Sequence, residues 1–204
     1  PLATEFRPGA SLATSAGYGY LRGVLGTQDE HHRAQGSLAL SGRFLPWIAA
    51  SLRVDGRYDV HVQQGQRDDS GVGEPRFSVR FNGVLAKTLG LGLQVSLWFP
   101  SHALPSVTLA AITPEFLGFV SLHPSRSVRF GLLGGYRLDR SGASAPEREN
   151  YSLADRVSLG VSDFHAAIVG AVVSGQLGPV ELFAEWRWEP LLGTNAPPLL
   201  ASPM

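Results

Sequence analysis

The amino-acid sequence predicts an all-β fold: an up-and-down antiparallel transmembrane β-barrel of about 8–10 strands. Residues 1–204 are expected to form a single barrel domain, alone or as part of a longer chain. Three observations predict this fold. Apolar and polar side chains alternate with a period of two along many segments, the connections between these segments alternate in length, and aromatic residues gather near the segment ends.

The alternation is clearest in segment 47–62. Its even-numbered residues from Ile48 to Val62 are apolar or small, whereas the five odd-numbered positions from Arg53 to His61 are all ionisable. A period of two indicates a β-strand with two unlike faces. These 16 residues exceed the usual length of a soluble strand, about 3–10 residues. A strand of this length and pattern is suited to crossing a bilayer obliquely.

The same pattern predicts nine strands. They lie near residues 10–25, 36–45, 47–62, 74–86, 89–100, 106–122, 127–139, 161–175 and 179–189. Residues 1–9 and 190–204 are expected to be irregular. Within 106–122 the alternation slips near Thr113-Pro114, where proline lacks the N–H that a strand ladder needs, so a bulge or break is expected there.

The connections between the predicted strands alternate in length. Long polar connections lie at 26–35, 63–73 and 140–160, and short ones at 45–46, 87–88, 123–126 and 175–179. Segment 101–105 is a modest exception. Because outer-membrane barrels have short periplasmic turns and long extracellular loops, the alternation predicts that the long loops lie outside the cell.

Composition excludes several classes of protein. The net charge is zero, so nothing indicates a nucleic-acid partner. The chain has no cysteine, which excludes disulfides and thiolate metal sites. No apolar run is long enough for a transmembrane helix. The first residues, Pro1-Leu2-Ala3-Thr4, lack the basic start and apolar run of a signal peptide.

Aromatic residues are expected to form two girdles at the membrane interfaces, where Tyr and Trp are favoured. The girdle residues towards the long loops are Tyr20, Tyr58, Phe77, Trp98, Phe99, Tyr136, Phe164, Trp186 and Trp188, and those beside a short turn are Phe44 and Trp47. The alternative explanation is that aromatic residues are simply common in strands.

With this alternation, loop asymmetry and aromatic placement, residues 10–190 resemble proteobacterial outer-membrane β-barrels of the OmpA-like or small-porin type. The resemblance implies a location in the bacterial outer membrane and contact with membrane lipid. Other envelope proteins could then bind through the 140–160 loop. Two features depart from that family: the chain ends in LLASPM rather than in an aromatic-terminated strand, and nine strands is an odd number.

An odd strand count leaves a sheet edge to be explained. Unpaired backbone groups in lipid cost several kcal/mol each, so nine strands alone should not persist. Either the chain is part of a longer protein or pairs with another segment, or the count is wrong near Thr113-Pro114. The sequence favours the first explanation.

The polar faces of the strands are expected to form a charged lumen. Its residues are Arg43, Arg53, Asp55, Arg57, Asp59, Arg76, Arg80, Arg129, Arg137, Asp139, Glu181, Glu185 and Arg187. Arg–carboxylate pairs could fill the narrow interior of such a barrel, which favours a structural, anchoring or partner-binding role. The alternative is a narrow porin-like channel for small polar solutes. A soluble lipocalin-like barrel would invert the two faces.

No catalytic residue, metal site or cofactor is assigned from the sequence, and the protein is not expected to be an enzyme. His165 beside Asp163, and His61 beside Asp59, lie near the predicted outer rim, but no family signature surrounds either. His123 and Ser125 fall in a short turn at the other end.

A possible metal site and a glycine-rich segment have simpler explanations. The histidine pair His31-His32, with Asp29 and Glu30, could bind a metal but is better explained as a solvated loop. The glycines of GLLGGY, residues 131–136, are expected to serve strand curvature and close packing.

Overall fold

A computed structural model describes residues 9–22, 30–61, 69–100, 108–125, 127–145, 161–178, 180–194 and 196. The strands are β1 (Gly9–Arg22), β2 (Glu30–Leu45), β3 (Ile48–His61), β4 (Asp69–Ala86), β5 (Leu89–Trp98), β6 (Thr113–Leu122), β7 (Val128–Arg137), β8 (His165–Leu177), β9 (Val180–Trp188) and β10 (Leu191–Leu192). Two short 3-10 helices, η1 (Leu109–Ala111) and η2 (Ser141–Ser144), complete the described elements. In these ranges no helix is long and apolar enough to cross a membrane.

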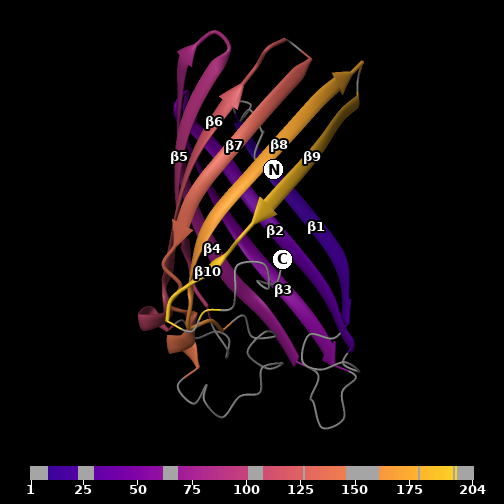
Figure 1. Cartoon of the computed structure of the whole chain (residues 1–204), viewed down its shortest axis with the longest axis vertical. Coiled ribbons are helices and arrows are strands. Elements are labelled where there is room, and N and C mark those ends of the chain that lie inside the picture. Colours follow the sequence, from indigo (N-terminus) through magenta and orange to yellow (C-terminus); the bar gives the residue numbers. More distant parts are fainter. Residues whose placement is uncertain are drawn as a thin grey trace.

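The strands form one antiparallel, up-and-down sheet that curls into a half-barrel (Figure 1). Each strand from β1 to β8 pairs with its neighbours in the sequence. Both β9 and β10 pair with β8 in one continuous register, because Trp188 lies opposite Val169 and Leu191 opposite Ala166. Pro190 separates β9 from β10, since it cannot donate a ladder hydrogen bond. The sheet therefore has nine strand positions.

The odd number of positions sets the direction of the two edge strands. Neighbouring strands run in opposite directions, so β1 and β9 run in the same direction. Among the residues that the structure describes, β1 and β9 do not pair with each other. Direct closure between them would need a parallel pair, whereas one further strand between them could pair antiparallel with both.

The predicted all-β, up-and-down antiparallel sheet is confirmed, and each of the nine predicted strands overlaps an observed one. Three strand boundaries were wrong by at least five residues. β2 begins at Glu30 and β4 at Asp69, so parts of the predicted loops 26–35 and 63–73 are strand. Their polar sequences still pair with β3, down to His31 opposite His61.

The third wrong boundary is the start of β6. This strand was predicted to begin at 106, but residues 108–112 are not strand and β6 begins at Thr113, after the turn of η1. Residues 106 and 107 lie outside the described ranges. Pro114 is thus the second residue of β6, opposite Leu97 of β5, where a missing N–H is better tolerated than in the middle of a strand. The connection between β5 and β6 therefore runs from 99 to 112 and is no longer an exception to the alternation of loop lengths.

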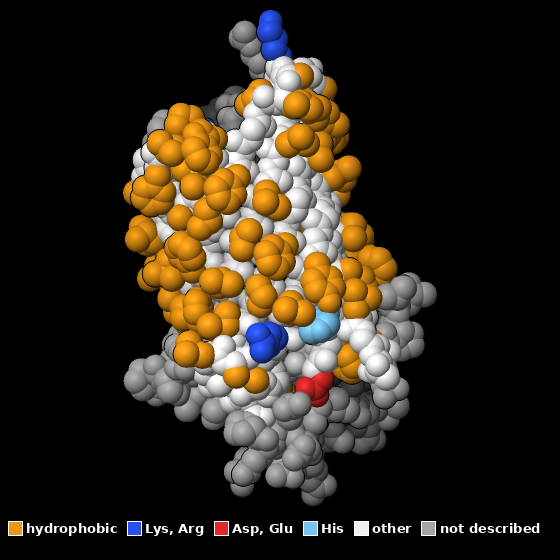
Figure 2. Space-filling view, turned by 90° about the vertical axis from the view of Figure 1, so that its left-hand side faces the viewer, with side chains coloured by type: hydrophobic (Ala, Val, Ile, Leu, Met, Phe, Trp, Pro, Cys, Tyr) orange, Lys and Arg blue, Asp and Glu red, His pale blue; other side chains and the backbone are white. Residues whose placement is uncertain are grey.

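The outer face of the half-barrel exposes large apolar side chains over much of its height (Figure 2). Every long strand contributes at least one such side chain: Leu12, Leu40, Leu52, Phe81, Leu93, Phe116, Leu132, Val173 and Trp186. Leu40 and Leu52 lie directly opposite each other on neighbouring strands, as do Phe81 and Leu93. This continuous apolar surface on the convex side is the reverse of a lipocalin-like arrangement, which needs its apolar face inside.

On the inner face of β6–β8 a small apolar cluster is fully buried. It consists of Leu117, Leu133 and Ile168, with Phe119 packed against it. The register places the large side chains opposite glycines: Leu117 faces Gly135, and Leu133 faces Gly170. A Cβ atom on Gly135 would lie 2.5 Å from the Leu117 side chain and 2.2 Å from the Phe116 carbonyl oxygen.

The same arrangement recurs at two neighbouring pairs. Phe119 lies opposite Gly92, and Val172 opposite Gly131. A Cβ atom on Gly92 would lie 1.9 Å from the Phe119 ring, and one on Gly131 2.6 Å from Val172. The close-packing role predicted for the glycines of segment 131–136 is therefore confirmed at Gly131 and Gly135. The glycines leave room for large side chains on a concave surface.

Candidate functional site: the inner face of the sheet

The inner face carries most of the polar and charged side chains of the described strands. One row across the sheet pairs Ser11, Ser41, Ser51, Ser78, Ser96, Glu115 and Arg137 in this order from β1 to β7. Hydroxyl groups thus line one half of this row, and a charged pair lies in the other half.

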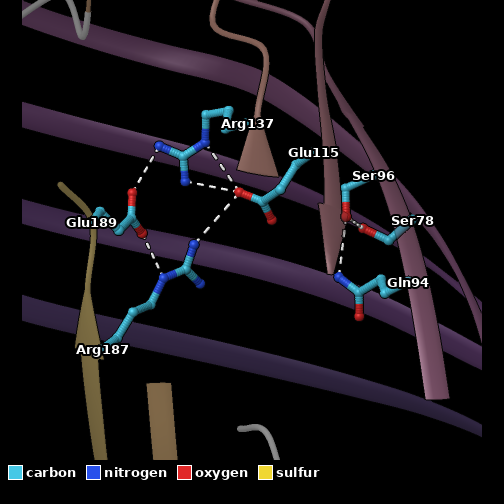
Figure 3. Close-up of polar contacts among 7 residues, drawn as sticks. All are labelled: Ser78, Gln94, Ser96, Glu115, Arg137, Arg187 and Glu189. Atoms are coloured by element: carbon cyan, nitrogen blue, oxygen red, sulfur yellow. Dashed lines mark hydrogen bonds and ion pairs between the residues drawn. The ribbon is translucent and has the colours of Figure 1, made fainter. Parts of the chain in front are cut away.

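Glu115 and Arg137 belong to a ring of four charges with Arg187 and Glu189 (Figure 3). Arg137 donates through Nε and Nη2 to Glu115 Oε2, at 3.0 and 2.8 Å. The same arginine forms an ion pair with Glu189, with Nη1 2.9 Å from Oε2. Arg187 closes the ring, because its Nε lies 2.5 Å from Glu189 Oε1 and its Nη2 3.5 Å from Glu115 Oε2.

This four-charge ring joins strands that are not neighbours. β8 lies between β7, which carries Arg137, and β9, which carries Arg187. β8 places the small residues Ala166 and Gly170 opposite these two arginines, which leaves space for the side chains to meet above it. The ring has two positive and two negative charges, and the Glu115 side chain is only 6% exposed. It is therefore a neutral, largely buried assembly that anchors β9 to β6 and β7.

A second polar chain runs along β4 and β5 (Figure 3). Ser78 donates to Ser96 at 2.9 Å, and Gln94 Nε2 donates to the same Ser96 hydroxyl at 3.0 Å. Arg80 Nε donates to Gln94 Oε1 at 3.1 Å, and its guanidinium lies over the Phe119 ring at 4.4 Å. Through Arg80, this chain reaches the apolar cluster.

The other half of the inner face, on β1–β5, is hollow. A cavity of about 370 Å³ lies there. Its described side chains include four arginines, Arg33, Arg53, Arg57 and Arg76, together with Asp55 and Trp98. Arg53 Nε lies 2.5 Å from Asp55 Oδ1. The guanidinium of Arg76 lies 5.8 Å from the centre of the Trp98 ring. We call this the arginine cavity.

A compact hydrogen-bonded turn lies beyond the end of β7. Asp139 Oδ1 accepts hydrogen bonds from the backbone N–H and the hydroxyl of Ser141, at 2.9 and 2.6 Å. The backbone N–H of Ser162 donates to Ser141 Oγ at 2.8 Å. Burial raises the pKa of Asp139, although its hydrogen bonds from Ser141 favour the charged form. Since the Ser141 hydroxyl is fully buried and occupied, it is a structural group.

The structure describes the surroundings of most of the predicted lumen charges. Arg53 forms an ion pair with Asp55, and Arg80 donates a hydrogen bond to Gln94. Arg137 and Arg187 belong to the four-charge ring. Asp139 bonds to Ser141, and Arg43 donates to the Leu45 and Pro46 carbonyls of its own turn. Arg57 and Arg76 line the arginine cavity, Arg129 is half-buried on β7, and Glu185 is exposed on β9. The predictions for the Asp59 and Glu181 side chains fall outside the described residues.

Most residues predicted for the aromatic girdles are exposed. The exposed members are Tyr20, Tyr58, Phe77, Tyr136, Trp186, Phe44 and Trp47, whereas Phe99, Phe164 and Trp188 are partly buried. The prediction for Trp98 needs correction, because this residue lines the arginine cavity on the inner face rather than facing outward in a girdle. It alternates with its neighbours Leu97 and Phe99 along the strand, so it cannot share their face.

The histidine pair is another correction. His31 and His32 belong to β2 rather than to a solvated loop, and His31 is only 3% exposed. The His32 ring bonds to the Tyr18 hydroxyl and lies 5.0 Å from the Tyr20 ring. In the described part of the chain, no three His, Asp or Glu side chains gather in a way that could hold a metal ion.

Neither carboxylate of the four-charge ring is among the residues predicted for the lumen. Glu115 follows the Thr113-Pro114 break, which hid the phase of β6, and Glu189 precedes Pro190, where the irregular tail was expected to begin. Counting in steps of two would have found them, because Glu115 shares a strand face with Leu117 and Phe119, and Glu189 shares one with Arg187.

No protein-family model, curated protein sequence or solved structure matches this chain.

Proposed function

We propose that this chain is an integral β-barrel of a bacterial outer membrane, with a structural, anchoring or partner-binding role and no enzymatic activity. The observation that carries the proposal is the pair of unlike faces: a convex face of exposed large apolar side chains, and a concave face with serine, arginine and carboxylate groups. Lipid-facing and lumen-facing residues alternate in this way in transmembrane barrels. In the long-loop orientation, residues 140–160 lie on the cell surface, where other envelope proteins could bind.

The four-charge ring supports an anchor over a channel on one side of the lumen, because neutral Arg–Glu pairs and the apolar cluster fill the inner face of β6–β9. A narrow channel for small polar solutes is a second candidate. The arginine cavity favours it, since it leaves a polar, hollow region on β1–β5.

Single-channel conductance of the full-length protein in planar bilayers separates the two roles. Steady openings would establish the channel, whereas insertion without conductance would establish the closed, anchoring barrel. Failure to insert into any bilayer or vesicle would contradict both.

A pair of arginine substitutions tests the membrane assignment itself. Leu52, the fifth of the 14 residues of β3, is exposed on the outer face, and Ser51 lies beside it on the inner face. Leu52→Arg should lower the free energy of unfolding in vesicles by roughly 2–4 kcal/mol, because it places a charge near the bilayer midplane. Ser51→Arg should cost less. Equal losses at the two positions, measured by denaturant unfolding, would contradict the face assignment.

A further inference from the structure

The arginine cavity brings two like charges together on neighbouring strands. The register of β3 and β4 places Arg53 directly opposite Arg76. Like charges in directly opposed positions repel each other. Asp55 lies next to Arg53 on the same face of β3 and pairs with it, but the described lining of the cavity has four guanidinium groups and this one carboxylate.

One donor of Arg76 is unsatisfied. Its guanidinium lies over the Trp98 ring, and its Nε–H is buried without a hydrogen-bond acceptor among the described residues. A buried donor normally has an acceptor, so an orphaned one in a polar cavity needs an explanation. Arg53 and Arg76 lie side by side on neighbouring strands at this cavity. Their donors are available for one shared oxyanion, which guanidinium groups bind with paired hydrogen bonds.

The four-charge ring shows what the same residue types do where no ligand is needed. There, two arginines meet two glutamates, and every charge has an opposite partner within 3.5 Å. The described lining of the arginine cavity has one carboxylate, that of Asp55. The cavity of about 370 Å³ has room for a small organic molecule, and Trp98 gives it one aromatic wall.

We propose that the arginine cavity binds a small organic anion, whose carboxylate or phosphate group lies between Arg53 and Arg76 and whose body packs beside Trp98. This proposal rests on the proposed function, because the inner face must be open to water, as it is in a barrel lumen. A small organic anion is then the class of molecule that the lumen holds.

The test is equilibrium binding by the full chain, refolded in a zwitterionic detergent. Isothermal titration calorimetry with glucuronate and with glucose 6-phosphate probes the carboxylate and the phosphate, and neutral glucose is the control ligand. Saturable binding of at least one of the two anions is expected, with no binding of glucose. If neither anion binds saturably, or if glucose binds as well as the anions, the proposal is wrong.

Three variants locate the site. Arg76→Gln and Arg53→Gln should each weaken binding about tenfold or more, because each removes charged hydrogen bonds to the ligand. Arg76→Lys keeps the charge but loses the planar fork, so it should weaken binding by several-fold. This conservative variant keeps the proposal testable if Arg76→Gln does not fold.

Arg43→Gln is the matched control, since Arg43 lies on the inner face of the same half but bonds to its own turn. It should leave the affinity unchanged. If Arg43→Gln and Arg76→Gln weaken anion binding equally, the binding reflects general attraction by positive charge, and the proposed site is wrong. If the protein inserts into bilayers but binds no anion, this proposal is wrong and the membrane function still stands. Binding in detergent by a protein that never inserts would leave the site standing and contradict the membrane function.

Discussion

The inner face of this sheet is built in two different ways. On β6–β10, large apolar side chains lie over glycines of neighbouring strands, and two arginines pair with two glutamates. On β1–β5, serines and glycines leave a hollow lined by arginines. Both halves belong to one continuous sheet with the same antiparallel pairing. The difference therefore comes from side chains alone: one half is filled by its own residues, and the other keeps an accessible polar surface.

This comparison predicts that stability is concentrated in β6–β10, whereas β1–β5 tolerates change. The largest difference should come from the acidic residues. Glu115→Gln should lower the free energy of unfolding by about 3–5 kcal/mol, because it leaves two arginines to share Glu189 in a largely buried site. Asp55→Asn should cost less than about 1 kcal/mol, because the Arg53 side chain in that pair is 50% exposed. If the two variants lose equal free energy of unfolding in urea, the two halves do not differ in this way.

The apolar cluster should give the next largest effect. Leu133 is 4% exposed and packs with Leu117 and Ile168. Leu133→Ala should cost roughly 2–4 kcal/mol, because it removes buried methyl groups and leaves a cavity. Ser51→Ala, in the hollow half, should change stability by less than about 0.5 kcal/mol. The measurement is the free energy of unfolding of each variant in the same vesicles. A loss below 1 kcal/mol for Leu133→Ala would mean that the cluster does not stabilise this half.

Glycines sharpen the comparison further. Gly135→Ala should cost roughly 1–3 kcal/mol, because the new Cβ would meet the Phe116 carbonyl oxygen at 2.2 Å and the backbone must move. Gly36→Ala on β2 is the matched substitution in the other half. Its Cβ would lie 3.5 Å from the Ser15 carbonyl oxygen, an ordinary contact, so little change is expected. Comparable denaturation midpoints for the two variants would show that the tight packing around Gly135 relaxes without cost.

Much of this fold follows from the sequence, because a period of two is a local signal. The alternation in 47–62 fixes the faces of β3, and the two-residue connection at 46–47 fixes its pairing with β2. The extensions of β2 and β4 could not be predicted in this way. Apart from Ala34 and Val72, their residues 30–35 and 69–73 are polar or glycine. They become strand because neighbouring strands, β1 and β3 for β2 and β3 for β4, offer backbone partners.

The candidate site was harder to predict for a different reason. Its inner-face arginines were visible in the sequence, but their partners depend on register and on which residues leave room. Glu115 reaches Arg187 only because β8 places small residues between their strands. Similarly, the direct opposition of Arg53 and Arg76 follows from the pairing of β3 with β4. An arginine that is paired in one half and an arginine that lines a cavity in the other have the same appearance in the sequence.

The smallest expected effect concerns pH at the end of the filled half. Burial raises the pKa of Asp139 above its unfolded value, near 3.9. A group with a raised folded pKa binds protons more tightly in the folded state. Its stabilising contribution is therefore present below the unfolded value and is lost as the pH rises through the folded value.

Asp139→Asn should remove this dependence, because the amide carries no charge to bury and its oxygen can still accept the hydrogen bonds from Ser141. The measurement is the difference in unfolding midpoint between the wild-type protein and the variant, from pH 3 upward. The variant should gain stability relative to the wild-type protein as the pH rises. Asp163→Asn, at an exposed position of the same end, controls for the loss of a negative charge. A difference that is constant across the pH range, or that Asp163→Asn reproduces, would show that burial of Asp139 carries no cost.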